Sequence, residues 1–278
     1  MSGFVAGLRA EFTKLLTTRL WWILAVVLFA YIALTAGGLG AFFGAVATGK
    51  IAPEGASAGG GFDLRQMGSL PPLIYSFATA VGYVFPVLLG ALLTTGEFRH
   101  QTLTPTFLAN PRRGQVLGAK SASSLVIGAA FGVIALIASV GAGALALSAF
   151  GVDTMLGDSD TWALFGRALL AMALWAAIGV GLGVLVPNQT AAIVIVLAFT
   201  QFVEPLLRLA ASFSDVTAKI GEFLPGAASD SLVGASIFVA SNPGASALDW
   251  WAGGLVLLGY AVLVTAIGYA ITWRRDVT

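Results

Sequence analysis

Long runs of apolar residues without charge dominate this sequence of 278 residues. A run of about 18 or more such residues is long enough to cross the hydrocarbon core of a membrane as a helix. Only 10% of the residues are charged, whereas soluble domains carry about 25%. A chain with so little charge has little to show to water, so the runs predict an integral membrane protein rather than a soluble enzyme.

Six of these runs are predicted to be transmembrane helices, because lipid cannot hydrogen-bond free backbone groups and every span must therefore be helical. The predicted spans are 20–47, 70–95, 116–150, 162–186, 190–210 and 250–273. The first run is too long for the apolar region of a cleaved signal peptide, so it is expected to be retained. The fold class is an all-α integral membrane protein with a single transmembrane domain over 1–278.

Two segments between the spans have a different composition. Segment 49–69 is rich in Gly, Ala and Ser and is expected to be loosely structured. Segment 211–249 contains apolar patches too short to span a membrane, so it is predicted to form short re-entrant or interfacial helices on the outer side.

The distribution of Lys and Arg predicts the orientation, since cytoplasmic loops are enriched in these residues. With six spans both termini lie on one side. That side holds nine of the 14 Lys and Arg residues, the opposite side holds four, and Arg167 lies inside a span. Both termini are therefore predicted to be cytoplasmic, in the inner or plasma membrane of a prokaryotic cell.

The N-terminal segment 1–19 is predicted to be an amphipathic helix. Phe4, Leu8, Phe12 and Leu15 recur every three or four positions. Such a helix lies in the membrane interface with its apolar side in lipid. Two roles remain open for it, a positively charged anchor that fixes topology or a lever joined to the first span.

One large loop is predicted on the cytoplasmic side, after the second span. Within 97–110, a short helix would place Leu103, Phe107 and Leu108 on one side, and Asn110-Pro111 would end it. An apolar edge between charged residues suits docking of another protein. A loop that only fixes topology would have the same composition.

Two motifs resemble the permeases of ABC type-2 transporters. The first reads Glu97-Phe98-Arg99-His100-Gln101-Thr102, followed by Pro111-Arg112-Arg113 and Lys120. That family has roughly an acidic residue, an aromatic residue, Arg, any residue, Gly and Thr, with a later Arg and Lys, so Gln101 replaces the usual Gly. The second motif, in 11–22, resembles the family's approach to its first span.

This resemblance implies a specific assembly. Segment 1–19 would be a connecting helix, and 97–110 would be a coupling helix seated on a separate ATPase subunit. Two permeases, either two copies of this chain or this chain and a related one, would combine with two ATPases into one exporter. The residues that would couple to the ATPase are Glu97, Phe98, Arg99, His100, Thr102, Leu103, Phe107, Leu108, Arg112 and Arg113.

The chemistry of ATP hydrolysis is missing from the chain itself. The stretch 44–50 has the glycine spacing of a phosphate loop and ends in Lys50, but Ile51 follows where a hydroxyl for Mg²⁺ is required. ATP and Mg²⁺ are therefore expected in the partner, and no cofactor and no enzymatic activity are expected here. The chain has no Cys and a single His, His100, so thiolate sites and histidine metal clusters are excluded. The basic residues are not pooled as a nucleic-acid site would require.

Three charged residues are predicted to cluster inside the membrane. Arg167 lies in the fourth span, and Glu204 and Arg208 lie in the fifth. Counting residues from the turn that joins these spans puts all three at similar depth in the outer half. The structural interpretation is mutual neutralisation of costly charge, and the functional one is a gate or a headgroup contact near the outer exit.

The expected function is the permease subunit of an ATP-driven exporter for an amphipathic, lipid-like or drug-like cargo. An ion-coupled secondary transporter is the first alternative, and it would normally show ionisable residues or broken helices near the midplane. The sequence predicts neither clearly. A membrane scaffold or immunity protein without cargo is the second alternative. In every case membrane lipid is a partner.

Overall fold

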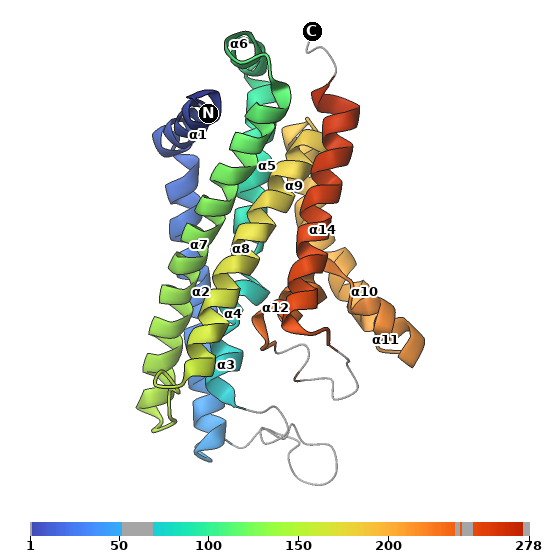
Figure 1. Cartoon of the computed structure of the whole chain (residues 1–278). Coiled ribbons are helices and arrows are strands. Elements are labelled where there is room, and N and C mark those ends of the chain that lie inside the picture. Colours follow the sequence, from blue (N-terminus) through green and yellow to red (C-terminus); the bar gives the residue numbers. More distant parts are fainter. Residues whose placement is uncertain (1, 52–68, 237–239, 241–246, 275–278) are drawn as a thin grey trace.

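The protein is a bundle of long helices in the computed structural model (Figure 1). The structure describes residues 2–51, 69–236, 240 and 247–274, and every regular element in them is a helix. Six helical segments of this described part are long and apolar enough to cross a membrane. They are Leu20–Ala47, Leu70–Arg99, Arg113–Ala149, Ser159–Leu185, Gln189–Ala211 and Trp250–Trp273. The all-α prediction with six candidate spans agrees with this architecture, while most of segment 49–69 lies outside the described residues.

Three of the candidate spans are single α-helices and three contain breaks or π-helical turns. The first, third and fourth spans are α2 (Leu20–Ala47), α7 (Arg113–Ala149) and α8 (Ser159–Leu185). The second span comprises α3 (Leu70–Tyr75), α4 (Phe77–Ala80) and α5 (Val84–Arg99). The fifth comprises α9 (Gln189–Ala198), η2 (Phe199–Val203) and α10 (Glu204–Ala211), and the sixth α14 (Trp250–Gly268) and η3 (Tyr269–Trp273).

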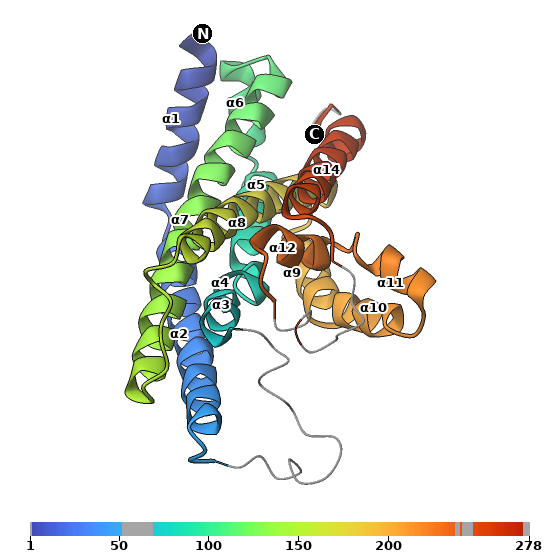
Figure 2. The same cartoon turned by 60° about the horizontal axis from the view of Figure 1, so that its bottom comes forward.

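Short helices lie outside these spans. They are α1 (Ser2–Thr17), α6 (Leu103–Ala109), α11 (Asp215–Gly221) and α12 (Pro225–Val233). Figure 1 places α1, α6 and η3 at one end of the bundle, called here the α1 end, and α3, α11 and α12 toward the other, called the α12 end. Turning the molecule shows α1 beside α7 and shows α10 and α11 projecting away from the bundle (Figure 2).

The second span, predicted over 70–95 with a kink at Pro86, is divided into three helices. The breaks fall at Ser76 and over Val81–Tyr83, just before Pro86. Pro86 has no backbone N–H to donate and its ring crowds the carbonyl four residues earlier, that of Gly82, so the helix cannot run through this point unbroken. The irregular turn leaves Tyr83 free to stack on Trp175 of α8, with ring centroids 4.4 Å apart.

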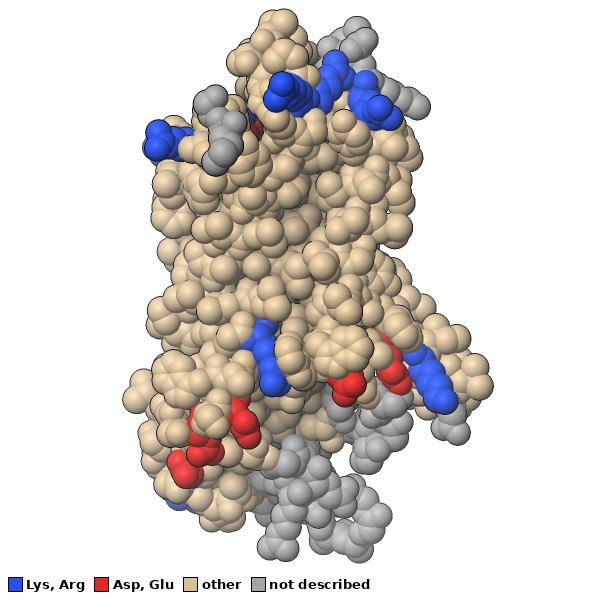
Figure 3. Space-filling view, in the orientation of Figure 1, with Lys and Arg blue, Asp and Glu red and all other residues tan. Residues whose placement is uncertain are grey.

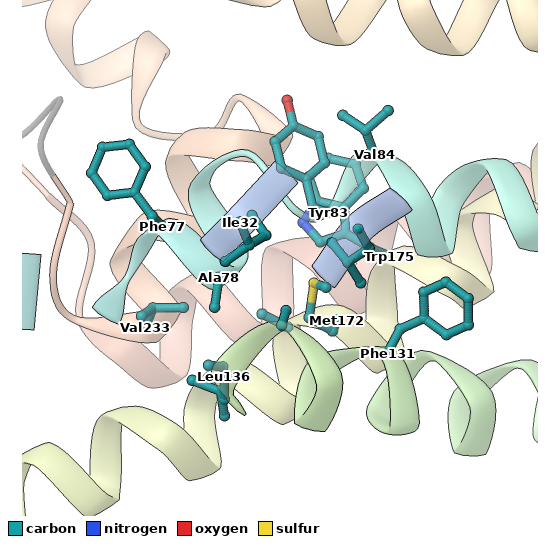
Figure 4. Packing of buried hydrophobic residues seen from close by; sticks show 14 of the residues in the cluster. Ile32, Phe77, Ala78, Tyr83, Val84, Phe131, Leu136, Met172, Trp175 and Val233 are labelled. Carbon is teal, nitrogen blue, oxygen red and sulfur yellow. The ribbon is translucent and has the colours of Figure 1, made fainter. Parts of the chain in front are cut away.

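Small residues allow the central helices to approach closely. A Cβ atom added to Gly90 of α5 would lie 2.3 Å from the carbonyl oxygen of Ala176, and one added to Gly179 would lie 2.2 Å from that of Val87. Only glycine permits this backbone contact between α5 and α8. Larger side chains fill the space beside it, and Figure 4 shows Tyr83 and Trp175 close to Met172 in the same core.

The charged residues mark the two ends of the molecule. In Figure 3, Lys and Arg gather at the α1 end, most of the visible Asp and Glu lie toward the α12 end, and a broad uncharged belt separates them. The 28 residues of α2 extend about 42 Å at 1.5 Å per residue. This length exceeds the roughly 30 Å of a membrane's hydrocarbon core.

Candidate functional sites: two buried charge clusters

Four charged side chains form a closed cluster at the α1 end, called here the α1 cluster. It comprises Glu11 and Lys14 of α1, Glu97 in the last turn of α5 and Lys120 near the start of α7. Lys120 Nζ lies 2.5 Å from Glu11 Oε2 and 3.1 Å from Glu97 Oε1. Lys14 Nζ lies 2.9 Å from Glu11 Oε1 and 2.7 Å from Glu97 Oε1. Each ammonium group therefore bridges the same two carboxylates, and the charges balance.

Burial makes this cluster more than a surface ion pair. Lys120 is 2% exposed and Glu11 is 8% exposed. Charges removed from water must be paired and hydrogen-bonded to be tolerated. Glu97 also lies at a helix C-terminus, where the helix dipole disfavours a carboxylate, so the two lysines are required there. The cluster thus ties α1 to the ends of the second and third spans.

The electrostatics of α1 follow from this pairing. Burial by itself would raise the pKa of the Glu11 carboxyl, but the ammonium groups of Lys120 and Lys14 outweigh it and lower this pKa. Burial would lower the pKa of Lys14, but the carboxylates of Glu97 and Glu11 outweigh it and raise this pKa. Both groups therefore stay charged across the neutral pH range.

Apolar contacts hold α6 beside this cluster. Leu103 is fully buried against Val116, Val184 and Trp273, among others. The ring of Phe107 meets the ring of Trp273 edge to face, with centroids 5.4 Å apart. The Arg113 guanidinium also lies over the Phe107 ring, 4.9 Å from its centroid. The outer side of α6 presents Leu108, which is 80% exposed.

The coupling residues predicted from the sequence therefore divide into two sets. The single helix expected over 97–110 is wrong, since α5 continues to Arg99 and α6 begins at Leu103. Residues turned into the protein wholly or in part are Glu97, Phe98, Leu103, Phe107 and Arg113, and residues exposed at the surface are Arg99, His100, Thr102, Leu108 and Arg112. The expected apolar edge of Leu103, Phe107 and Leu108 does not form, because a helix that short must bury some of its apolar residues to stay attached.

The turn between α5 and α6 has an unusual backbone conformation at Gln101. This residue has φ of +53°, a left-handed conformation. Glycine adopts this conformation without steric cost, whereas other residues rarely do. Gln101 thus lies at a position where the backbone favours glycine.

The N-terminal helix packs only part of its apolar stripe against the bundle. Leu15 is buried and Phe12 packs against the core, whereas Phe4 is exposed and Leu8 only half-buried. The face that packs on α7 instead includes Gly7, where an added Cβ would lie 3.4 Å from the Cβ of Ala119. The apolar stripe was correct in period, but the small and charged residues beside it decide which side of α1 faces the bundle.

A groove of about 530 Å³ separates α1 from α6. Small residues of α1, including Ala6 and Ala10, form one wall, and Pro105 and Ala109 of α6 form the other. Glu11 and Lys14 of the α1 cluster lie in its lining as well. The α1 end therefore presents an indented surface, with one side fixed by the α1 cluster and the other side held by the apolar contacts of α6.

A second buried charge cluster lies toward the α12 end, called here the α12 cluster. Arg208 Nη2 lies 3.0 Å from Glu204 Oε1, and Arg208 Nη1 lies 2.7 Å from Asp230 Oδ2. Glu204 is 1% exposed, and its Oε2 atom has no hydrogen-bond partner within the described residues. This cluster pairs two acids with one base, whereas the α1 cluster has two acids and two bases.

Local backbone features bring the α12 cluster together. The π-helical turn η2 directly precedes Glu204, and such turns often occur at functional sites. Pro225 begins α12 at its first position and Gly234 ends it in the left-handed conformation, as a C-terminal glycine does. Gly226 has no side chain to block the approach of α12, because an added Cβ would lie within 2.4 Å of both the Glu204 carboxylate and the Arg208 guanidinium.

Arg167 does not join this cluster, which corrects the predicted set of Arg167, Glu204 and Arg208. Its guanidinium lies over the ring of Trp250, 5.0 Å from the centroid, and Asp230 takes the place expected for it. Counting residues along a helix predicts how far along the axis a side chain lies, but not the direction in which it points.

Sequence reasoning did not predict that Asp230 joins the α12 cluster or that the four side chains of the α1 cluster contact one another. Glu11, Lys14, Glu97 and Lys120 all stood within recognised motifs, and a signal was available, since charges of both signs lie near span ends on one predicted side. Asp230 gave only a weak signal, an acidic residue after Pro225-Gly226 in a segment expected outside. Among the described residues no group of three or more His, Cys, Asp or Glu side chains is placed to hold a metal ion.

The fold defines the class of protein as a helical one whose six long apolar segments suit a multi-pass membrane protein. No protein-family model matches this chain, and no curated protein matches it closely enough to indicate a relative.

Proposed function

We propose that this chain is the membrane-spanning permease subunit of an ATP-binding cassette exporter, with ATP hydrolysed by a separate ATPase subunit at the α1 end. The observation that supports this most is the α1 cluster, which joins α1 to the ends of two spans beside α6. A partner that pushes on α6 and α1 would move the second, third and first spans as one unit. That is the mechanical link a transport motor requires.

The surface of α6 specifies how the ATPase would bind. Leu108 projects from α6 and is 80% exposed, while Leu103 and Phe107 on the other side hold α6 to the bundle. The partner would cover Leu108 and the neighbouring exposed residues, and the groove between α1 and α6 would lie at the edge of the contact. We place this end in the cytoplasm because it carries most of the Lys and Arg residues.

The cargo and assembly follow from the same proposal. A permease of this kind would work as a dimer, with a second copy or a related chain. The spans are apolar and hold few charges, which favours an amphipathic, lipid-like or drug-like cargo over a small ion. The cell membrane of a prokaryote is the proposed location.

The proposal predicts a gene for an ABC ATPase beside the gene for this chain. The test is co-expression of that ATPase with this chain, followed by purification through a tag on this chain. Leu108→Asp should abolish recovery of the ATPase, because it puts a charge in the centre of the contact. Phe213→Asp is the matched control, since Phe213 is also 80% exposed but lies after α10, away from the α1 end. The proposal fails if the ATPase is never recovered and the purified chain transports cargo in vesicles without ATP.

One observation favours the ion-coupled secondary transporter as the second candidate. The broken second span and the π-helical turn of the fifth both lie next to the α12 cluster, where Glu204 Oε2 has no hydrogen-bond partner in the described part of the chain. Broken helices and a buried carboxylate are typical of ion-coupled sites. In vesicles, a dependence on a proton or sodium gradient that Glu204→Gln removes would support this candidate over the exporter.

A further inference from the structure

A lateral groove of about 960 Å³ runs along the bundle between α7, α8 and α14. Its walls are almost entirely apolar, and it extends from Trp250 and Trp251 at the start of α14 to Gly114 and Tyr269 near the α1 end. The distance along α14 between these ends is close to the thickness of a hydrocarbon core, at about 1.5 Å per residue. The groove is therefore oriented as a lipid acyl chain would be.

Arg167 lies at one end of this groove. Leu170, Leu174 and Ala177 line the wall formed by α8, and Arg167 continues the same helical stripe by one turn toward the α12 end. Its guanidinium stacks over Trp250, which also lines the groove. The cation is thus at the rim of the apolar surface rather than in the α12 cluster.

Arg167 has no counter-ion among the described residues, since none of their carboxylates forms a salt bridge with it. Its guanidinium lies over the Trp250 ring and close to Gly234, where an added Cβ would lie 3.1 Å from Arg167 Nη1. An arginine within a membrane span is costly unless it pairs with an anion or reaches the interface. Trp250 and Trp251 are both about half-exposed, and tryptophans of this kind gather at the level of lipid headgroups. Arg167 therefore lies where phosphates of the bilayer are found.

We propose that this groove is a binding site for one phospholipid of the leaflet at the α12 end, with its phosphate on the Arg167 guanidinium and one acyl chain along α8 and α14. Guanidinium and phosphate form paired, charge-assisted hydrogen bonds, and the apolar walls supply the contact for the chain. This site does not depend on whether transport is driven by ATP or by an ion gradient.

The experiment is native mass spectrometry of the purified chain with added phosphatidylglycerol or with diacylglycerol of the same acyl chains. The phospholipid should be retained about tenfold better, the change expected for one charge-assisted hydrogen bond. Arg167→Gln should lower phosphatidylglycerol retention to the level of diacylglycerol, and Arg167→Lys should keep part of the preference. The proposal is overturned if Arg167→Gln retains phosphatidylglycerol as the unaltered chain does. If Arg167→Gln does not fold, equal retention of the two lipids by the unaltered chain overturns it instead.

A matched pair of glycine variants tests the groove itself. Gly254 lines the groove, and a Cβ added there meets only Leu232, in ordinary van der Waals contact. Gly259 lies on the same helix outside the groove, and a Cβ added there meets no neighbour within 4 Å. Gly254→Leu should reduce retention of both lipids, while Gly259→Leu should leave it unchanged. Equal retention by these two variants would place the lipid elsewhere on the surface and overturn the site.

Discussion

The α1 cluster and the α12 cluster both bury ionised side chains, but they differ in charge balance and in how they are built. In the α1 cluster two ammonium groups bridge two carboxylates. In the α12 cluster one guanidinium serves two carboxylates. Each cluster has one carboxylate oxygen without a hydrogen-bond partner among the described residues, Glu97 Oε2 in the α1 cluster and Glu204 Oε2 in the α12 cluster, so the clusters differ in their ratio of acids to bases. A balanced closed cluster suits a rigid joint, since any change leaves a charge unpaired. An unbalanced cluster has a group that can change its state at lower cost.

The backbone is regular around the α1 cluster and irregular around the α12 cluster. The α1 cluster lies on three regular helices, α1, α5 and α7. The α12 cluster lies beside a π-helical turn and close to the broken second span. Irregular backbone in a membrane is tolerated where it is buried in protein or lines a cavity. We infer that the α1 end transmits force and that rearrangement is concentrated toward the α12 end.

The largest expected effect comes from removing the buried cation of the α1 cluster. Lys120→Met leaves Glu11 and Glu97 buried with one fewer counter-ion, which should cost about 3–5 kcal/mol in the free energy of unfolding. Lys14→Met is the control, and it should cost less because the Lys14 side chain is 40% exposed and water replaces part of its role. Equal losses in unfolding measurements on detergent-solubilised protein would refute the proposed joint.

A pair of isosteric variants compares the clusters directly. Glu97→Gln upsets the balance of the α1 cluster and should lower the free energy of unfolding by about 1–3 kcal/mol. Glu204→Gln keeps the Arg208–Asp230 pair and removes the excess negative charge, so its effect should stay within about 1 kcal/mol. The same unfolding measurement checks both, and the contrast between clusters is wrong if Glu204→Gln proves the more damaging.

The pH dependence of stability should reflect the α1 cluster. The Glu11 pKa is lowered from 4.5 in the folded state, so its contribution is complete above about pH 4.5 and is lost as the pH falls through the lowered value. The Lys14 pKa is raised from 10.5, so its contribution is complete below about pH 10.5 and is lost above the raised value. Melting curves from pH 3 to 8 should show the acid loss, and Glu11→Gln should flatten it. An unchanged acid slope in that variant would contradict the assigned pairing.

The smallest expected effect concerns the turn that joins the α1 cluster to α6. Gln101→Gly should raise the free energy of unfolding by up to about 1 kcal/mol, because glycine relieves the left-handed strain but loses more backbone entropy on folding. Met155→Gly is a matched control at the other left-handed position, φ +51°, outside α6. Only Gln101→Gly should also affect binding of a partner at α6. A destabilised Gln101→Gly variant would contradict the left-handed conformation assigned to Gln101.

Much of the fold was accessible from the sequence because one physical requirement dominates it. Lipid excludes unpaired backbone groups and charge, so long apolar runs had to be helices. The same rule says nothing of rotation about the helix axis. Arg167 was assigned the wrong neighbours, and Leu103 was placed on the exposed edge of a helix that buries it.

The sites were less accessible, since they depend on contacts distant in sequence. Glu11 and Lys120 are separated by 109 positions, and no local period relates them. Pro86 gave a visible signal for a kink, yet the break in the second span also depends on how Tyr83 stacks on Trp175. The left-handed conformation of Gln101 was not predicted either, because glutamine rarely adopts it and gives no local signal for it.

The most direct test of the proposed joint is the distance between α1 and α6. The chain contains no Cys, so spin labels at Thr13→Cys and Thr104→Cys, both exposed positions, would report only this distance. Pulsed electron paramagnetic resonance should give one narrow distribution for the otherwise unaltered chain and a clearly broader one when Lys120→Met is added. An equally narrow distribution in the presence of Lys120→Met would contradict the account, because α1 and α6 would then be held together without the buried cluster.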